Sequence, residues 1–442
     1  MNDMAEKINV IAGLGDTGLS YARYLAARAQ PFVVMDAKPA AFQVDQLNRF
    51  APGAAVGDFD RETMLRAEAV YVSPGVPLMQ PDLLAAAEAG TPLVGDVALF
   101  GELAAAPVVA ITGTNGKSTV ASLLHLAAAD QQAGVYLGGN IGTPCLDILR
   151  EDASLYVLEV SSYQLELAQD LRAKVAVVLN LAPDHLDRYT SIDHYFNTKL
   201  AIYDHCEQAV INRAIGDRIG PLAGTTASFG WDRGDEPGHF HARSEGDGFV
   251  LMNGREVLMH SSDSLLSGRH NCLNLMAAFA AGWLLDLDLA GMAKSFGQFR
   301  GLPHRSQLIA DKKGIRYIND SKATNPGALV AAVSGQAVSR NIHLIAGGVS
   351  KGLSFDGLES EIIDYVKAAY LIGDASAELA AALPNLATSK HIGLREAVCA
   401  AQQQAQPGDV ILLAPGCASF DQFRNYAERG QTFVDVVAEL SQ

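Results

Sequence analysis

The feature that most constrains how this chain folds is an alternation of short apolar runs with Ala- and Leu-rich stretches of helical length, repeated along nearly the whole sequence. Parallel strands need a crossover connection, usually a helix, so this alternation is typical of parallel sheets. The sequence therefore predicts an α/β fold. The expected strands are 8–12, 32–35, 69–72, 107–111, 155–160, 175–179, 315–318, 342–345, 369–372 and 410–414.

The chain length, and the positions where Gly and Pro interrupt the pattern, indicate that these elements form three blocks. A chain of 442 residues is long enough for about three domains. We expect domains over 1–95, 96–301 and 302–442, the last starting where Gly and Pro interrupt the chain. The stretch 216–269 is richer in Gly, Asp and His, which predicts an irregular or antiparallel excursion of the central block.

The acidic balance of the chain, 33 Lys and Arg against 49 Asp and Glu, argues against binding to nucleic acid or to an anionic membrane. The five cysteines have no Cys-x-x-Cys spacing, which favours reduced thiols over a zinc ribbon or disulfide scaffold. Residues 1–7 lack signal-peptide features, and the apolar run 275–285 is about half of the roughly 20 residues that span a bilayer. We expect a cytoplasmic protein with small-molecule ligands.

A glycine-rich loop at 13–18 follows the first predicted strand and satisfies the pattern G-x-G-x-x-G. Asp36 stands at the end of the next predicted strand, where a dinucleotide-binding fold places the acid that binds a ribose. By itself this pattern favours a Rossmann-like domain and a nicotinamide or flavin enzyme. A tight turn that binds another nucleotide, or none, is the alternative that the residues leave open.

A stronger signal is the loop 113–119, Gly-Thr-Asn-Gly-Lys-Ser-Thr, between a predicted strand and a helix expected to begin near Val120. Backbone N–H groups of such a P-loop and the N-terminal end of its helix bind phosphate, while Lys117 reaches the terminal phosphates and Ser118 is placed to bind Mg²⁺. The spacing is a shortened variant of the usual P-loop pattern.

Acidic and imidazole side chains follow two further predicted strands. Glu159 ends one strand, and Asp184 and His185 follow the next. Because the carboxyl ends of parallel strands meet at the edge where ligands bind, we expect these side chains beside the P-loop as metal or phosphate ligands. Lys199 lies in a predicted amphipathic helix, and this pattern alone indicates a surface lysine.

Three loops of the last block, 319–326, 347–352 and 415–419, also follow predicted strands and contribute lysines, hydroxyls and glycine-rich backbone. Each alone is compatible with an ordinary turn. Three such loops at the carboxyl edge of one sheet predict an anion-binding site.

Together these motifs resemble the ATP-dependent Mur ligases over essentially the whole chain, and in particular their D-glutamate-adding branch. The P-loop and the pairs 270–271 and 304–305 fit the whole family, whereas 320–325 and 417–423 fit that branch. The matching segments are 113–119, 159–164, 183–187, 268–271, 303–305, 319–325 and 415–423. The resemblance implies a Rossmann-like N-terminal domain, a central P-loop ATPase-type parallel sheet and a Rossmann-like C-terminal domain.

The resemblance also implies a reaction. ATP would drive amide bond formation between UDP-N-acetylmuramoyl-L-alanine and D-glutamate through an acyl phosphate, with two Mg²⁺ ions (Mn²⁺ as a substitute) and a CO₂-derived carbamate on Lys199. The resemblance reverses two interpretations made from the residues alone. The loop 13–18 would hold the UDP part of the substrate without redox chemistry, and Lys199 would become a metal ligand.

Matching positions imply roles for individual residues. The catalytic set would be Lys117, His185, Lys199 and Lys351. One ion would be held by Ser118 and Glu159, the other by His185 and Lys199. ATP would be bound by Gly113, Thr114, Asn115, Gly116, Lys117, Ser118, Thr119, Asn271, Asn274, His304, Arg305 and Asp320. The UDP substrate would be bound by Thr17, Asp36, Lys38, Ser73, Gly75 and Asn140, and D-glutamate by Lys322, Thr324, Lys351, Ser419 and Tyr426.

Three alternatives remain open at this point. A sibling Mur ligase or a folylpolyglutamate-type ligase keeps the chemistry but adds a different amino acid, although 319–325 lacks the acceptor motif of the diamino-acid-adding branch. A nicotinamide dehydrogenase leaves the P-loop unexplained. A non-catalytic nucleotide switch leaves Glu159, His185 and Lys199 unexplained. The expected assembly state is a monomer.

Overall fold

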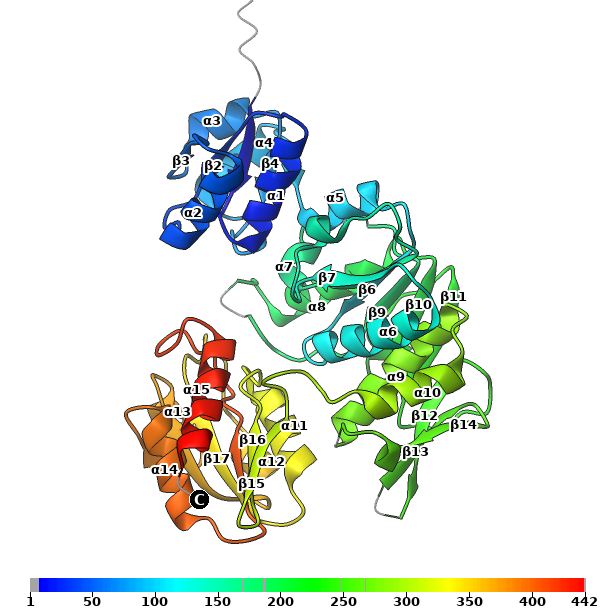
Figure 1. Cartoon of the computed structure of the whole chain (residues 1–442), viewed down its shortest axis with the longest axis vertical. Coiled ribbons are helices and arrows are strands. Elements are labelled where there is room, and N and C mark those ends of the chain that lie inside the picture. The colour runs from blue at the N-terminus through cyan, green and yellow to red at the C-terminus, as the bar shows by residue number, and fades with distance from the viewer. Residues whose placement is uncertain (1–7, 169–170, 186–187, 247, 267, 441–442) are drawn as a thin grey trace, which may run out of the picture.

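The computed structural model describes residues 8–168, 171–185, 188–246, 248–266 and 268–440, and it has three β-sheets flanked by helices (Figure 1). The sheets follow one another along the chain, so the α/β fold expected from the alternation of apolar runs is confirmed. Residues 1–7, and Leu186 and Asp187 of the segment 183–187, lie outside the described residues. Among the residues described, no helix combines the length and the apolar character needed to cross a bilayer.

The N-terminal sheet is parallel, with the strand order β3-β2-β1-β4-β5. Its strands are β1 (Asn9–Ala12), β2 (Phe32–Met35), β3 (Val56–Gly57), β4 (Val70–Val72) and β5 (Leu93–Val94). Its helices are α1 (Asp16–Ala27), α2 (Ala41–Phe50), α3 (Arg61–Arg66) and α4 (Pro81–Glu88). The chain changes direction across the sheet between β1 and β4, which places the loop 13–18 at the switch point where such sheets bind ligands.

The central sheet has the order β14-β13-β12-β11-β10-β9-β6-β8-β7. Its strands are β6 (Val108–Thr112), β7 (Val135–Gly139), β8 (Leu155–Glu159), β9 (Val175–Val178), β10 (Gln208–Asn212), β11 (Thr225–Gly230), β12 (His239–Glu245), β13 (Gly248–Asn253) and β14 (Glu256–His260). Its helices are α5 (Asp96–Leu103), α6 (Lys117–Gln131), α7 (Ser162–Leu165), α8 (Ile192–Leu200), α9 (Arg269–Leu284) and α10 (Leu289–Gln298), with 3₁₀ turns η1 (Cys145–Ile148), η2 (Ala201–Tyr203), η3 (Arg213–Arg218) and η4 (Ser261–Asp263).

The stretch 216–269 is more regular than its composition predicts. Strands β11 and β12 continue the parallel part of the sheet, and only β13 and β14 are antiparallel. The prediction of an irregular or antiparallel segment is therefore correct for β13 and β14 and wrong for β11 and β12. The apolar run at 275–285 belongs to α9, which packs on β11 and α6 and is buried along most of its length.

The C-terminal sheet has the order β15-β16-β20-β17-β18-β19, with β15 antiparallel. Its strands are β15 (Gln307–Lys312), β16 (Ile315–Asn319), β17 (Ile342–Gly347), β18 (Val366–Ile372), β19 (Ala387–Lys390) and β20 (Val410–Leu413). Its helices are α11 (Pro326–Gln336), α12 (Leu358–Ile362), α13 (Ser376–Ala382), α14 (Leu394–Gln404) and α15 (Tyr426–Glu439).

Strand register brings the motifs of the central sheet to one edge. β6 lies between β8 and β9, with Ile111 opposite Glu159 and Thr112 opposite Val178. The segments that leave the three strands therefore meet beside the P-loop.

Candidate active site

The loop after β6 has the backbone of a phosphate-binding loop. Gly116, which precedes α6, has a φ of +87°, and a Cβ atom there would lie 2.4 Å from Oδ1 of Asn274. Glycine alone fits both constraints. Helix α6 begins at Lys117, earlier than the expected start near Val120, so Ser118 lies in its first turn, where free N–H groups favour an anion.

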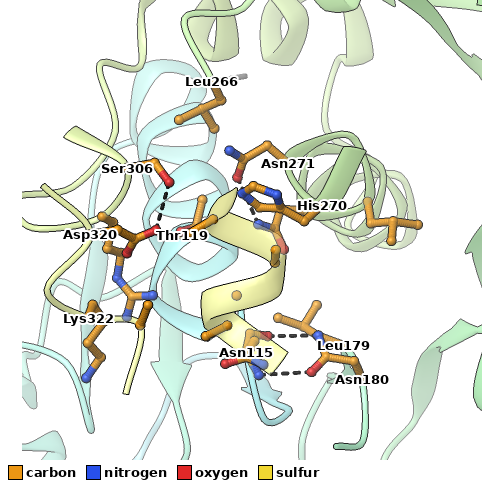
Figure 2. A pocket seen from close by; sticks show the side chains of 18 of the residues that line it. Asn115, Thr119, Leu179, Asn180, Leu266, His270, Asn271, Ser306, Asp320 and Lys322 are labelled. Carbon is orange, nitrogen blue, oxygen red and sulfur yellow. Dashed lines mark hydrogen bonds between the residues drawn. The ribbon is translucent and has the colours of Figure 1, made fainter. Parts of the chain in front are cut away.

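Asn180, which no motif predicts as a site residue, holds the P-loop in place (Figure 2). Its Oδ1 accepts a hydrogen bond from the backbone N of Asn115 at 2.9 Å, and its Nδ2 donates to the backbone O of Asn115 at 3.0 Å. The Oγ1 of Thr114 donates to the backbone O of Ala182 at 3.0 Å. The available signal was the position of Asn180 just after β9, at the ligand-binding edge.

The end of β8 brings a carboxylate against the P-loop. Glu159 is buried, and it accepts hydrogen bonds from Oγ of Ser118 and, at 2.7 Å, from Nδ2 of Asn140. Burial opposes ionisation, but the charge of Lys117 and these hydrogen bonds hold the pKa of Glu159 below its usual value. A carboxylate beside a hydroxyl is a donor set that suits Mg²⁺.

His185 forms a second polar cluster after β9. Its Nδ1 lies 2.7 Å from the hydroxyl of Tyr163, and its Nε2 lies 3.8 Å from Oδ2 of Asp184. Burial lowers the pKa of His185 to about 4, although the Asp184 carboxylate opposes the shift. The imidazole is therefore neutral at neutral pH, with Tyr163 orienting its ring, which is the state in which histidine binds a metal.

Lys199 is only 2% exposed, so the surface position that the helix pattern alone indicated is wrong. Helix α8 buries Tyr195, Phe196 and Lys199 together, and the Nζ of Lys199 lies 4.7 Å from the centre of the Tyr195 ring. Burial, and secondarily the charge of Lys117, lowers the pKa of Lys199 well below its usual value. An uncharged, nucleophilic amine is thus favoured next to the P-loop.

The loops of the C-terminal sheet form the opposite wall of this chamber. Nη2 of Arg305 donates to Oγ of Ser118 at 2.6 Å, and Nδ2 of Asn325 donates to Oδ2 of Asp184 at 3.1 Å. The wall is lined by Arg305, Lys322, Thr324, Asn325, Lys351, Ala418, Ser419, Phe420, Asn425 and Tyr426. These described residues include three cations and no carboxylate, so the wall attracts anions.

A second pocket lies between the P-loop, the start of α9 and the C-terminal sheet (Figure 2). Asp320 and Ser306, hydrogen-bonded at 2.8 Å, lie on one side, and His270 and Asn271 lie on the other. Burial raises the pKa of Asp320 to about 6 and lowers the pKa of His270 to about 4. Apolar walls with a few polar groups suit a nucleoside.

His304 is not among the residues that line this pocket. Its Nδ1 lies 3.0 Å from Nδ2 of Asn319, and a Cβ atom at Gly430 of α15 would lie 2.3 Å from that same Nδ1. His304 therefore packs behind the loop that carries Asp320. His270 lines the pocket beside Asn271. It was not predicted as a site residue, although it belongs to the segment 268–271 on which the resemblance partly rests.

A third pocket, of about 640 Å³, lies between the N-terminal sheet and the edge of the central one and is large enough for a nucleotide-sized ligand. The carboxylate of Asp36 accepts hydrogen bonds from the backbone N of Leu14 at 2.7 Å and of Lys38 at 2.8 Å. Asn140 lines this pocket and also the chamber at the P-loop. The predicted residues that line it are Thr17, Asp36, Lys38, Ser73, Gly75 and Asn140, and Gln164, which was not predicted, joins them.

Arg188 connects the N-terminal and central parts of the site. Its guanidinium donates to the backbone O of Pro74 at 2.8 Å and of Val76 at 3.2 Å, in the loop that lines the third pocket. It also pairs with Glu166 and lies 4.2 Å from the centre of the Tyr163 ring. The third pocket is thus tied to the tyrosine that orients His185.

Fold and site together define a three-domain enzyme with a P-loop nucleotide site and two adjoining pockets. Family models match the Mur ligase MurD-like N-terminal domain at 7–95, the Mur ligase middle domain at 111–282 and the Mur ligase glutamate ligase domain at 304–417. The chain belongs to the Mur ligase family. This membership excludes the nicotinamide dehydrogenase suggested by the loop 13–18.

Curated relatives match over their whole length. A UDP-N-acetylmuramoylalanine–D-glutamate ligase of Marinobacter nauticus is 40% identical, with 99% of each chain covered. The ligase of the same name from Saccharophagus degradans is 42% identical, over 98% of this chain and 97% of the other.

Solved structures share the fold at low sequence identity. UDP-N-acetylmuramate-alanine ligase MurC of Thermotoga maritima superposes with a TM-score of 0.64 at 15% identity, covering 98% of this chain and 100% of the other. MurF of Acinetobacter baumannii gives a TM-score of 0.63 at 17% identity, with coverage of 99% and 92%. The three-domain arrangement is therefore that of Mur ligases.

Proposed function

We propose that this protein is an ATP-dependent ligase that joins D-glutamate to UDP-N-acetylmuramoyl-L-alanine, releasing ADP and phosphate, in the cytoplasmic stage of peptidoglycan precursor synthesis. The observation that carries the proposal is one chamber in which the P-loop faces a wall of the C-terminal domain that carries Arg305, Lys322 and Lys351 and, among its described residues, no carboxylate. The P-loop suits ATP, and the wall suits an acceptor with two carboxylates. The names of the full-length relatives support the same reaction.

We assign one substrate to each domain, with limits 1–95, 96–301 and 302–442. The UDP part binds the N-terminal pocket, ATP binds the P-loop and the pocket beside it, and D-glutamate binds the wall of the C-terminal domain. Asn140 lies where the third pocket joins the chamber, so the muramoyl end of the substrate reaches the P-loop past this residue. One chain supplies all three pockets, so the proposed reaction needs no second subunit.

The reaction that we propose has two steps. A carboxylate oxygen of the L-alanyl end attacks the γ-phosphorus of ATP, the bond to the ADP oxygen breaks, and an acyl phosphate forms. The amine of D-glutamate then attacks the acyl carbon, loses a proton and expels phosphate. Both steps build negative charge on oxygen, so Lys117, Arg305 and Lys351 contribute by positioning and electrostatic stabilisation.

The donor groups of the chamber fit two Mg²⁺ or Mn²⁺ ions. Ser118 and Glu159 would hold one ion, and His185 and a carbamate on Lys199 the other. A buried amine with a depressed pKa is the form that takes up CO₂. The ions would neutralise phosphate charge.

Phosphate release from ATP tests the proposal, with Mg²⁺, UDP-N-acetylmuramoyl-L-alanine and a panel of amino acids. We expect release with D-glutamate alone and a product heavier by one glutamyl unit in the mass spectrum. Release confined to another amino acid would identify a sibling activity, a different Mur ligase or a folylpolyglutamate-type ligase. No release with any amino acid would overturn the ligase assignment.

A further inference from the structure

Arg429 of α15 is one of the largest fully buried side chains of the protein, with 1% of its surface exposed. Buried arginines are normally paired with a carboxylate. Within the ranges that the structure describes, no Asp or Glu side chain accepts a hydrogen bond or forms an ion pair with Arg429. Burial lowers the pKa of Arg429 to about 10, although the charge of the nearby Asp421 opposes the shift, so the guanidinium stays charged at neutral pH.

The guanidinium is instead satisfied by three separate loops. Nε donates to Oγ of Ser321 at 3.0 Å, and Nη2 donates to the backbone O of Ser321 at 2.9 Å and of Cys417 at 3.1 Å. Nη1 donates to the backbone O of Gly347 and of Ala418, both at 3.4 Å. Five contacts match the five N–H donors of arginine, a number that lysine cannot supply.

The loops are packed directly on this group. Gly348 has a φ of +131°, and a Cβ atom there would lie 3.2 Å from Nη1 of Arg429 and 2.0 Å from the backbone O of Ala418. Val349 and Ala418 exchange backbone hydrogen bonds at 2.9 and 3.0 Å. The loops 347–352 and 415–419 therefore form one unit around the guanidinium.

The same three loops carry the polar wall of the chamber. Lys322 and Thr324 follow Ser321, Lys351 follows Gly347, and Ser419 follows Ala418, and all four line the chamber. We propose that Arg429 is the positioning residue of the acceptor subsite: it holds the three loops in register and thereby places the basic side chains of the wall where they select a dicarboxylic amino acid. The inference rests on the proposed function in one respect, which is that the amino acid binds at this wall.

The test is a set of three KM values, for ATP, for the UDP substrate and for the amino acid, in Arg429→Lys and in the neutral, similarly sized Arg429→Met. Arg429→Lys keeps the charge but loses donors. We expect its KM for the amino acid to rise about tenfold or more, as for loss of a charge-assisted hydrogen bond. Arg429→Met should raise that KM further. The KM for the UDP substrate should stay within about twofold in both variants, because none of these loops lines its pocket. The KM for ATP should rise less than the KM for the amino acid, because only the loop 319–326, through Asp320 and Lys322, also lines the pocket assigned to ATP.

Arg395→Lys is the matched control, since Arg395 lies on the neighbouring α14 and pairs with Glu439 at the surface. It should leave all three KM values unchanged. An equal rise of the three values in Arg429→Lys, or an unchanged KM for the amino acid, would overturn the inference. Arg429→Lys decides the question even if Arg429→Met does not fold.

The amino acid in this experiment is whichever one supports phosphate release by the unchanged enzyme. An acceptor with one carboxylate would overturn the selection of a dicarboxylate, while the KM pattern would still test the positioning role. Failure of the proposed substrate and failure of the role of Arg429 are therefore distinguishable.

Discussion

The two glycine-rich loops of this protein, 13–18 after β1 and 113–119 after β6, share a local construction and differ in their neighbours. Each follows a buried parallel strand and leads into a helix. The first is braced by Asp36, which accepts a hydrogen bond from its backbone, and by Ser73, whose Oγ donates to it at 2.7 Å. The second contains Lys117 and faces Glu159 and the cations of the C-terminal wall.

The comparison shows that a glycine pattern specifies a turn and a helix start, while the neighbours specify the chemistry. The first loop carries no lysine or arginine, and the nearby Lys38 supplies a single positive charge. It suits binding of a nucleotide substrate that does not react there. The second loop lies among groups that stabilise charge as it develops.

The strongest test of this difference is Lys117→Ala. In the structure the Nζ of Lys117 donates to the backbone O of Gly113 and of Thr114, both at 2.9 Å. We expect turnover to fall by about a thousandfold or more, because a cation at the transferred phosphoryl group is lost. Phosphate release measures the effect, with thermal unfolding as the check on folding. Near-normal turnover of Lys117→Ala would show that the loop 113–119 has no more chemical role than the loop 13–18.

Lys199→Ala should also be inactive, yet regain part of its activity with acetate or formate, because a small carboxylate would replace the proposed carbamate. Turnover is measured with and without added carboxylate. Lys174→Ala is the control, since Lys174 pairs with Glu207 at the surface and should not respond. Full activity of Lys199→Ala without CO₂ would refute the carbamate.

Lys38→Ala probes the first loop's pocket and should affect binding alone. We expect the KM for the UDP substrate to rise about tenfold, with kcat nearly unchanged, because one charged contact is lost far from the reacting atoms. Steady-state kinetics with the UDP substrate varied measure both constants. A fall in kcat at constant KM would assign this pocket a chemical role.

The smallest expected effect concerns pH. Burial lowers the pKa of Lys322 to about 7, so the fraction of Lys322 that carries a positive charge falls as pH rises through 7. We expect the KM for D-glutamate to rise by about threefold or more above that pH. Lys322→Arg should flatten this dependence, because arginine stays charged. A flat profile in the unchanged enzyme would show that Lys322 does not bind the acceptor as a cation.

Much of the fold and part of the site were accessible from sequence. The ten expected strands, the P-loop and the strand-end position of Glu159 depend on a few adjacent residues, and the structure places them where the pattern predicts, whereas other strands, such as β7 and β10, were not predicted. Lys199 was not accessible to pattern reasoning, because helix periodicity shows that a face is apolar but not what covers it. Only the family resemblance pointed to it.

Sequence by itself determined the alternation that makes three sheets and the glycine-rich loops that lead from a strand into a helix, since backbone conformation is a local property. Tertiary structure alone decided that His270 lines the pocket beside the P-loop, whereas His304 does not. It also decided that Asn180 holds the P-loop and that Arg429 joins three loops. These roles depend on contacts between segments far apart in the chain, which the packing of the sheets and helices sets.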